Sequence, residues 1–172
     1  MSARGEAASL QGAAMLTEKT RETINHWVSK FPPEKRRSAL IQSLIAAQEQ
    51  NGGWITQELT EAVADYLELP RVWAHEVVSF YSMFFTSPVG RHKVHICTNI
   101  SCWLNGADEL VAHAKKKLGV KLGGTTGDGR ITLVREEECL AGCCGAPMAV
   151  VDGHYKEHLD IEKLDALLDG LE

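Results

Sequence analysis

All five cysteines of this chain lie in its second half, and four of them form two short pairs. The pairs are Cys97-x4-Cys102 and Cys139-x3-Cys143, separated by 36 residues, and Cys144 directly follows the second pair. Thiolates grouped in this way bind a metal or a metal cluster, or form disulfides. A chain that uses both pairs at one site must fold so that two distant loops meet.

The spacing within the pairs distinguishes among the kinds of metal and redox site that cysteines form. Structural zinc sites favour C-x2-C turns, because a short turn aims two sulfurs at one small ion, and both pairs here are wider. A [2Fe–2S] cluster needs four thiolates, two per iron; a Rieske centre would need two histidines, and none lies close to the second pair. A C-x-x-C redox pair is absent. The spacing favours an iron–sulfur cluster, and leaves zinc, disulfides or unligated thiols as alternatives.

Three stretches of the chain carry a resemblance to a known family. They are Cys97-Thr-Asn-Ile-Ser-Cys102, Cys139-Leu-Ala-Gly-Cys-Cys-Gly-Ala-Pro147 and Val77-Val-Ser-Phe-Tyr-Ser-Met-Phe84. Together they resemble the thioredoxin-like [2Fe–2S] ferredoxin subunits of NADH dehydrogenases, including bacterial complex I. The resemblance extends over nearly the whole chain.

The resemblance implies a ligand set and a function. It places one [2Fe–2S] cluster on Cys97, Cys102, Cys139 and Cys143, and it agrees with the C-x3-C spacing in selecting Cys143 over Cys144. It implies that the cluster accepts one electron from FMN on a flavoprotein partner, which also carries the NADH site. Its partners would be that flavoprotein and the rest of the peripheral arm; the wider assembly would pass electrons to quinone and pump protons, and this chain alone would have no catalytic activity.

The sequence contains no recognisable nucleotide site or catalytic nucleophile. There is no G-x-G-x-x-G after an expected strand and no Walker A lysine. The glycine-rich stretch 119–129 follows a helix and precedes a strand, which is the wrong order for binding dinucleotide phosphates. No Ser-His-Asp or Cys-His arrangement can be assigned. These absences predict an electron carrier within a larger enzyme.

Composition and charge limit the class of protein, its partners and its cellular compartment. With 172 residues, 44% of them hydrophobic and 24% charged, the chain resembles an ordinary soluble protein. A net charge of −5 without a long basic run argues against nucleic acid as a partner. The sequence contains no apolar stretch of 18 residues, so we expect no membrane span. The polar N-terminus does not resemble a signal peptide. An odd cysteine count favours a reducing compartment, so we expect a cytoplasmic protein, peripheral to the inner membrane through its complex.

The first half is expected to be helical. Apolar residues recur at helical spacing in residues 18–30, 33–50, 56–67 and 70–84. The last of these segments is rich in aromatic residues, and its expected apolar face consists of Trp73, Val77, Phe80, Tyr81 and Phe84. These rings are expected to pack in a helical core, and some of them to form a docking surface or cover the cluster. Residues 1–86 are therefore expected to form a tail and a helical domain.

The second half, residues 87–172, alternates strands and helices. Strands are expected at 93–97 and 131–134, with a helix at 105–118 between them, and a hairpin is expected around Asp152-Gly153. A strand–helix–strand unit of this length predicts parallel strands. The fold class is therefore α+β: an N-terminal helical bundle followed by a thioredoxin-like α/β domain, with both cysteine pairs at one end of its sheet.

The acidic run Glu136-Glu137-Glu138 leads directly into Cys139. It is either a solvated charge run or a source of negative charge that opposes addition of an electron to the cluster. One carboxylate at about 10 Å, in an effective dielectric of about 20, costs roughly 1.7 kcal/mol, or about 70 mV. The second interpretation predicts a low reduction potential.

Two other functions fit the same motifs. One is the matching diaphorase subunit of an NAD-linked hydrogenase or formate dehydrogenase. The other, from a different class, is a zinc-stabilised interaction module without a redox role. Gene neighbours would identify the first, and colour would identify the second, because zinc–thiolate proteins are colourless.

Overall fold

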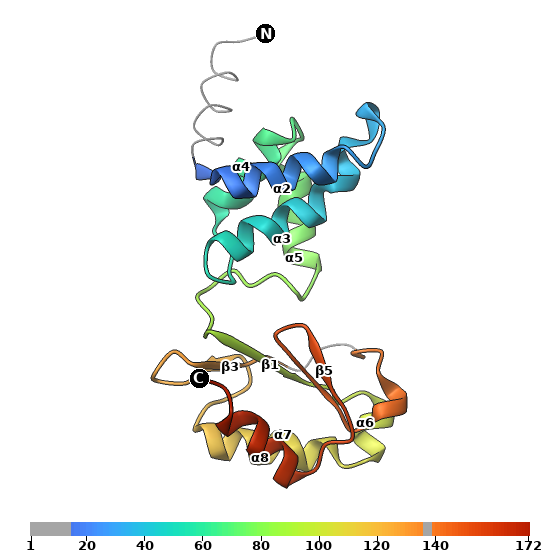
Figure 1. Cartoon of the computed structure of the whole chain (residues 1–172), viewed down its shortest axis with the longest axis vertical. Helices are drawn as coiled ribbons and strands as arrows, with labels where there is room; N and C mark the ends of the chain where they lie inside the picture. The colour runs from blue at the N-terminus through green and yellow to red at the C-terminus, as the bar shows by residue number, and fades with distance from the viewer. Residues whose placement is uncertain (1–14, 136–138) are drawn as a thin grey trace. The chain divides into compact units, whose positions relative to one another are not determined.

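The structure is a computed structural model that describes residues 15–135 and 139–172. The acidic run at 136–138 lies outside the described residues, so its interpretation stays a prediction. Contacts within the chain divide it into two units, Met1–Pro88 and Val89–Glu172 (Figure 1), and the described residues of each unit form their own apolar core. That residues 1–86 and 87–172 act as separate domains also stays a prediction.

The described part of the first unit contains helices and no strands. In chain order they are α2 (Glu18–Val28), the 3-10 helix η1 (Pro33–Ala39), α3 (Leu40–Gln50), α4 (Gln57–Tyr66) and α5 (Arg71–Phe80). Pro33 begins η1, where its missing N–H costs nothing. The Thr56 side chain caps α4 by accepting a hydrogen bond from the Leu59 N–H. Both signals were present in the sequence.

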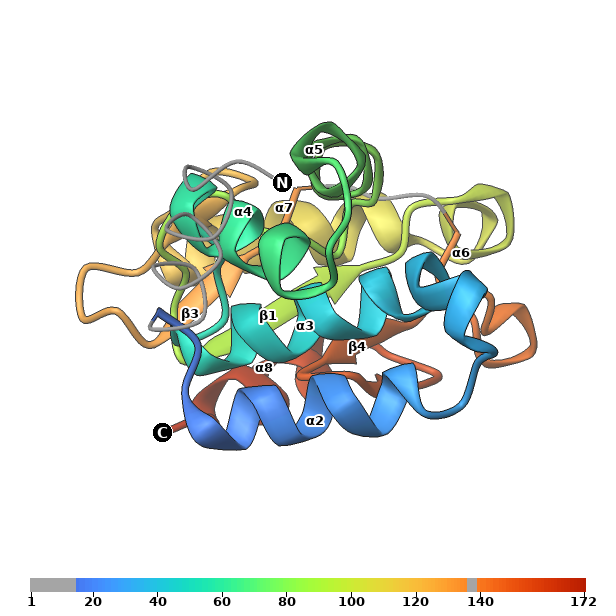
Figure 2. The ribbon, with the colours of Figure 1, turned by 90° about the horizontal axis from the view of Figure 1, so that it is seen from above.

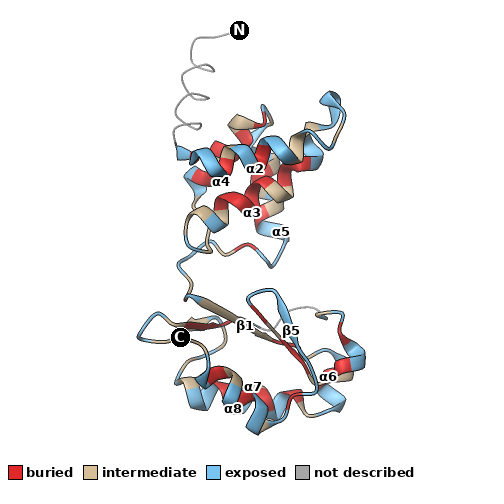
Figure 3. Cartoon of the chain, viewed as in Figure 1, coloured by how far each residue is buried: buried red, intermediate tan, exposed pale blue. Residues whose placement is uncertain are grey.

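The helices of the first unit bury their apolar faces against one another. α2 and α3 lie side by side (Figure 2), and α4 contacts both α3 and α5. Ile24, Leu44 and Val63, one from each of α2, α3 and α4, are fully buried. Figure 3 shows the buried residues gathered between the helices, with exposed residues on their outer faces. This is the pattern expected of amphipathic helices around a common core.

The aromatic segment of this unit differs from the expected single face. α5 ends at Phe80, because Tyr81 adopts an extended backbone conformation, with φ −90° and ψ 122°. Phe84 then folds back into the core and is buried, whereas the Phe80 ring is 79% exposed. The helix expected at 70–84 was therefore too long, and of its expected apolar face Phe84 lies in the core while Phe80 and Tyr81 remain on the surface.

The second unit is built on a five-stranded mixed sheet with the strand order β2-β3-β1-β4-β5. The strands are β1 (His92–Ile96), β2 (Gly124–Thr125), β3 (Ile131–Leu133), β4 (Ala149–Val151) and β5 (His154–Lys156). β1 pairs in parallel with β3, and β4 pairs antiparallel with both β1 and β5. The parallel pair and the hairpin are confirmed, as is the α+β class; the short strand β2 was not expected.

Helices α7 (Ala107–Leu118) and α8 (Ile161–Asp169) lie beside each other on one face of this sheet (Figure 1). The helix expected at 105–118 begins two residues later, at Ala107, because Gly106 adopts a left-handed φ of 88° just before α7. A separate five-residue helix, α6 (Ile100–Leu104), precedes it; it begins between the two cysteines of the first pair and includes Cys102. No helix in the described part of the chain is long and apolar enough to cross a membrane.

Candidate metal centre

The first cysteine pair is buried at the end of β1. Cys97 directly follows the strand, and its backbone N–H donates to the Met148 carbonyl at 3.1 Å. The chain then turns into α6 at Asn99, whose side chain accepts a hydrogen bond from the Ile100 N–H at 2.8 Å. The helix carries Cys102 back toward Cys97. The two residues are only 3% and 1% exposed, so the fold itself holds both thiols in place.

The second pair lies on an exposed loop. The Cys139 and Cys143 sulfur atoms are 3.6 Å apart, and the Ala141 backbone N–H donates to the Cys139 sulfur at 3.3 Å. Ala141 adopts a left-handed φ of 61°, which aims its N–H back at the sulfur. Cys143 begins the short 3-10 helix η2 (Cys143–Gly145), and Cys144 within it is exposed. This loop therefore presents two adjacent sulfurs to solvent.

The two pairs meet at the same end of the sheet. The thiols of Cys102 and Cys139 are close enough to Cys97 to lower its pKa, and Cys102 is close enough to Cys143 for their charges to interact. All four cysteines singled out in the sequence thus gather at one place. Their role as ligands stays a prediction.

The local environment shifts the pKa values of Cys97, Cys102 and Cys139 in different directions. Burial disfavours the Cys97 thiolate, but backbone hydrogen bonds from Leu140 and Asn99, together with the neighbouring thiols of Cys102 and Cys139, lower the pKa of Cys97 below its usual range. Burial, followed by the hydrogen bond with Cys97, raises the pKa of Cys102 to about 11. The Ala141 N–H favours the Cys139 thiolate, yet the neighbouring Cys143 thiol and burial raise the pKa of Cys139 overall. Four thiolates this close together need a cationic centre to compensate their charge.

Met148 forms the apolar floor of the site. It is fully buried and packs with Cys97, Cys102 and Ala107 in one cluster of buried side chains. Gly142, between the cysteines of the second pair, lies directly against it: a Cβ atom at Gly142 would overlap the Met148 sulfur and lie 2.9 Å from Met148 Cε. Glycine at this position lets the loop approach the floor of the site closely.

The hairpin fixes the other side of the loop. The Tyr155 hydroxyl on β5 donates to the Leu140 carbonyl at 2.8 Å, and the His158 N–H donates to the Gly145 carbonyl at 2.7 Å. The second cysteine pair is thus tied to β5 before Cys143 and to the residues that follow β5 after it. Neither contact could be read from the sequence, which placed the hairpin but not its contacts.

An exposed apolar patch lies beside the site on α6. Ile100, Trp103 and Leu104 are 68%, 54% and 71% exposed, and they flank the buried Cys102 on a helix of only five residues. Three large apolar side chains on so short a surface helix are typical of an interaction site. Sequence reasoning missed this patch because it placed no helix between the two cysteines, although Asn99 is a favourable N-cap residue.

The donor set fits a two-iron cluster. A [2Fe–2S] cluster takes its thiolates two per iron, and the site supplies one buried pair and one exposed pair. In the described part of the chain, no group of three His, Cys, Asp or Glu side chains is already arranged around a single metal-ion position. The backbone N–H groups that point at these sulfurs are the kind of contact that stabilises an iron–sulfur cluster.

Comparisons with known proteins point to the same chemistry. Residues 24–172 match the sequence model of the family described as thioredoxin-like [2Fe-2S] ferredoxin. The chain is 42% identical over 144 residues to a subunit of the NADH-quinone oxidoreductase of Rickettsia bellii, covering 84% of this chain and 86% of that protein. It is 40% identical over 150 residues to the corresponding NADH-quinone oxidoreductase protein of Rhizobium meliloti, covering 87% of each.

Among solved structures, a crystal structure of an NAD+-reducing [NiFe]-hydrogenase in the air-oxidised state is similar, with a TM-score of 0.61 and 25% sequence identity. The match covers 73% of this chain but only 22% of the hydrogenase chain. The same hydrogenase in the H2-reduced state gives a TM-score of 0.59. The likeness therefore concerns one part of a much larger polypeptide.

Proposed function

Because the chain belongs to the thioredoxin-like [2Fe–2S] ferredoxin family, we propose that it carries electrons in an NADH-quinone oxidoreductase, taking one electron at a time from FMN on a flavoprotein partner. The observation that carries this proposal is the meeting of two cysteine pairs, far apart in the sequence, at one end of the sheet. The family and the named relatives support the oxidoreductase assignment.

We assign the cluster ligands to Cys97, Cys102, Cys139 and Cys143. When bound, the cluster supplies a one-electron redox centre. The chain's own groups hold the sulfurs in position: the Ala141 N–H donates to the Cys139 sulfur, and β1 and α6 bury the other pair. This assignment requires no role for Cys144.

The flavoprotein partner and its NADH site lie outside this chain in our proposal, since the sequence has no nucleotide motif. Electrons must then cross a protein–protein interface close to the thiols. The α6 patch of Ile100, Trp103 and Leu104 adjoins Cys102, and we assign the contact with the flavoprotein to it. Covering these side chains would also keep water away from the site, which favours electron transfer over side reactions.

The helices of residues 1–86 form a bundle that adds partner contacts in this proposal, since they carry no redox chemistry of their own. The assembled complex would place the chain in the cytoplasm, peripheral to the inner membrane. A diaphorase role in an NAD-linked hydrogenase is the second candidate, and the likeness to the hydrogenase structure favours it. The relatives named as quinone-linked subunits, at about 40% identity over most of the chain, favour the first.

Purification of the chain tests the proposal directly. We expect a red-brown protein with two irons and two sulfides per chain, as a [2Fe–2S] cluster requires. Serine in place of any one of the four assigned cysteines should remove or severely perturb the visible absorbance. NADH oxidation with an artificial acceptor should appear only after the flavoprotein is added. A colourless zinc protein, or NADH oxidation by the chain alone, would contradict the proposal.

A further inference from the structure

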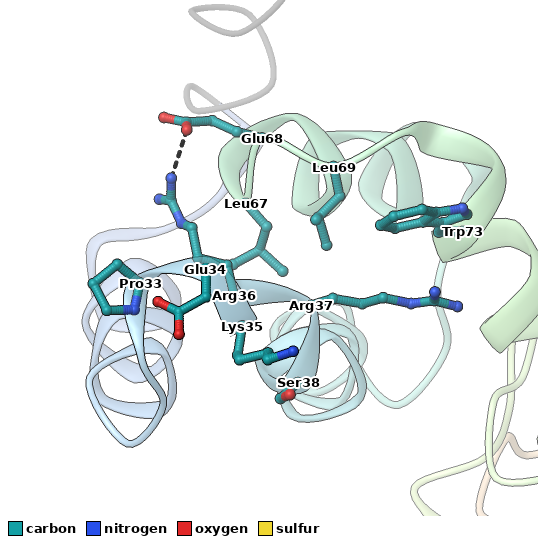
Figure 4. Close-up of a pocket in the computed structure, with 10 residues that line it drawn as sticks. All are labelled: Pro33, Glu34, Lys35, Arg36, Arg37, Ser38, Leu67, Glu68, Leu69 and Trp73. Carbon is teal, nitrogen blue, oxygen red and sulfur yellow. Dashed lines mark hydrogen bonds and ion pairs between the residues drawn. The ribbon is translucent and has the colours of Figure 1, made fainter.

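A surface cavity of about 590 Å³ in the first unit lies between η1 and the residues that connect α4 to α5 (Figure 4). Arg36 pairs with Glu68 at 2.6 Å, and the guanidinium carbon of Arg37 lies 4.2 Å from the centroid of the Trp73 ring. The lining contains side chains of both charges, so it favours no charged ligand. The second unit offers more, because two of its hydrogen bonds meet at a single peptide group beside the metal centre.

The peptide group between Leu140 and Ala141 is bonded at both of its ends. The Tyr155 hydroxyl donates to the Leu140 carbonyl at 2.8 Å. The N–H of the same peptide group, which belongs to Ala141, donates to the Cys139 sulfur at 3.3 Å. The hydroxyl, the peptide group and the sulfur thus form a chain of two hydrogen bonds in one direction. Hydrogen bonds in such a chain polarise one another, so the bond to the carbonyl makes the N–H a stronger donor to the sulfur.

The backbone does not favour this orientation of the peptide group. Ala141 has a φ of 61°, a conformation that residues with a side chain rarely adopt. Rotation of the peptide group by half a turn would bring this φ into the ordinary negative range and turn the N–H away from the Cys139 sulfur. Ala141 is exposed, so packing around its side chain does not oppose the rotation. The bond from Tyr155 does oppose it, because the rotation would carry the Leu140 carbonyl away from the hydroxyl.

The pleat of the sheet places Tyr155 on the face that the cysteine loop covers. Tyr155 lies opposite Val150 in the β4–β5 pairing, so the two side chains share one face of the sheet. Val150 and Leu140 both pack against the buried cluster that contains Cys97. The neighbours of Val150 on β4 belong instead to the main core of the sheet, as strand alternation requires. Tyr155 therefore reaches the loop from a regular strand position.

We propose that Tyr155 is a positioning residue that raises the reduction potential of the cluster through the Leu140–Ala141 peptide group. Its hydroxyl holds and polarises this peptide group, so that the Ala141 N–H faces the Cys139 sulfur. Reduction adds negative charge to the cluster and its sulfurs, so a donor at a sulfur stabilises the reduced state more than the oxidised state. The inference rests on the proposed function for the presence of a cluster, and adds a residue that tunes it.

A redox titration of the cluster-loaded full chain tests the role of Tyr155. Tyr155→Phe removes the hydroxyl and keeps the ring. The equilibrium constant for one-electron reduction should fall roughly threefold, as expected when one hydrogen bond is weakened, which equals about 30 mV at about 59 mV per tenfold change. Visible absorbance follows the titration.

Tyr66→Phe is the matched control for this titration. It also removes a hydroxyl hydrogen bond, to Asn25 Oδ1 at 3.1 Å, but in the first unit, which contributes no thiol to the metal centre. This variant should leave the potential unchanged. Equal potentials of Tyr155→Phe and Tyr66→Phe would overturn the proposal.

Hydrogen–deuterium exchange at the Ala141 amide gives a second readout, which does not depend on electron transfer. The residue lies on an exposed loop, so its N–H owes its protection to the bond with the Cys139 sulfur. Exchange at this amide should be severalfold faster in Tyr155→Phe than in the unaltered chain, and should be unchanged in Tyr66→Phe. The same rate in Tyr155→Phe as in the unaltered chain would show that the hydroxyl does not hold the peptide group, and would overturn the proposal.

Glycine at position 141 tests whether the unfavourable φ makes Tyr155 necessary. Glycine adopts a positive φ about as readily as a negative one, so Ala141→Gly reduces the tendency of the peptide group to rotate. The change in potential caused by Tyr155→Phe should therefore be smaller in the Ala141→Gly background. A change as large as in the unaltered background would refute the positioning role.

Iron content keeps the two proposals apart, because every variant retains the four assigned cysteines. A chain that binds no cluster would refute the proposed function, whatever the exchange at Ala141 shows. A cluster-loaded chain whose potential and Ala141 exchange do not respond to Tyr155→Phe would refute only the role of Tyr155.

Discussion

Substitution of Gly142 by alanine should destabilise the metal centre through Met148. Gly142 has a φ of −108°, which alanine tolerates, so the effect of the substitution is steric alone. The new Cβ would overlap the Met148 sulfur, and Met148 is fully buried with Cys97 and Cys102 beside it. The Met148 carbonyl also accepts the Cys97 N–H, so its backbone cannot retreat without disturbing the first cysteine pair.

Overpacking of this kind typically costs about 1–3 kcal/mol. With a urea dependence of about 1–3 kcal/mol per molar, the midpoint for loss of the cluster's visible absorbance should fall by about 1 M. Gly127→Ala is the matched control, because no heavy atom lies within 4 Å of a Cβ there. Its stability should change by no more than about 0.5 kcal/mol.

A double substitution shows whether the overlap is the cause. Met148→Ala removes the overlapping sulfur, so Gly142→Ala/Met148→Ala should be more stable than the sum of the single effects by about 1 kcal/mol. Strict additivity, or a Gly142→Ala midpoint equal to that of Gly127→Ala, would refute the idea that this loop rests on a closely packed floor.

Three further predictions concern the ligands, the acidic run and the helical unit. Cys144→Ser should leave the visible absorbance nearly intact while Cys143→Ser abolishes it; the reverse result would exchange their roles. Neutralising residues 136–138 together should raise the reduction potential of the cluster by tens of millivolts at low salt, because one close carboxylate costs about 70 mV before screening. An unchanged potential would mean that the run is solvated and does not act on the cluster. A chain starting at Ser87 should keep its cluster, because its core is separate, but bind the flavoprotein far more weakly; undiminished affinity would reduce the first unit to a fold stabiliser.

The parts of the fold that the sequence predicted correctly have strong local signals. Val94 and Ile96 alternate with polar residues in β1, and both are buried in the sheet. Asp152-Gly153 is a hairpin turn pair, and both residues adopt positive φ as that turn requires. Strand–helix–strand order then determined the parallel pairing, because few other connections are possible. The placement of both cysteine pairs at one end of the sheet followed from these elements.

The features that could not be predicted depend on contacts between distant residues or on very short elements. β2 is only two residues long and forms by pairing with β3. A strand this short has no alternating hydrophobic pattern from which it could be predicted. α5 ends at Phe80 instead of continuing to Phe84, and helix ends are the least certain part of any sequence pattern. The meeting of Gly142 with Met148 is a tertiary contact between a loop and the entry to β4.

The two cysteine pairs differ in access, since one is buried and the other faces solvent. Any reagent that approaches this end of the sheet, whether an iron donor, a chelator or an oxidant, meets Cys139, Cys143 and Cys144 before it meets Cys97. Assembly and decay of the centre therefore share one direction of approach, through the exposed loop. A partner that covers this loop would lengthen the lifetime of the centre by closing that approach, without adding a single ligand.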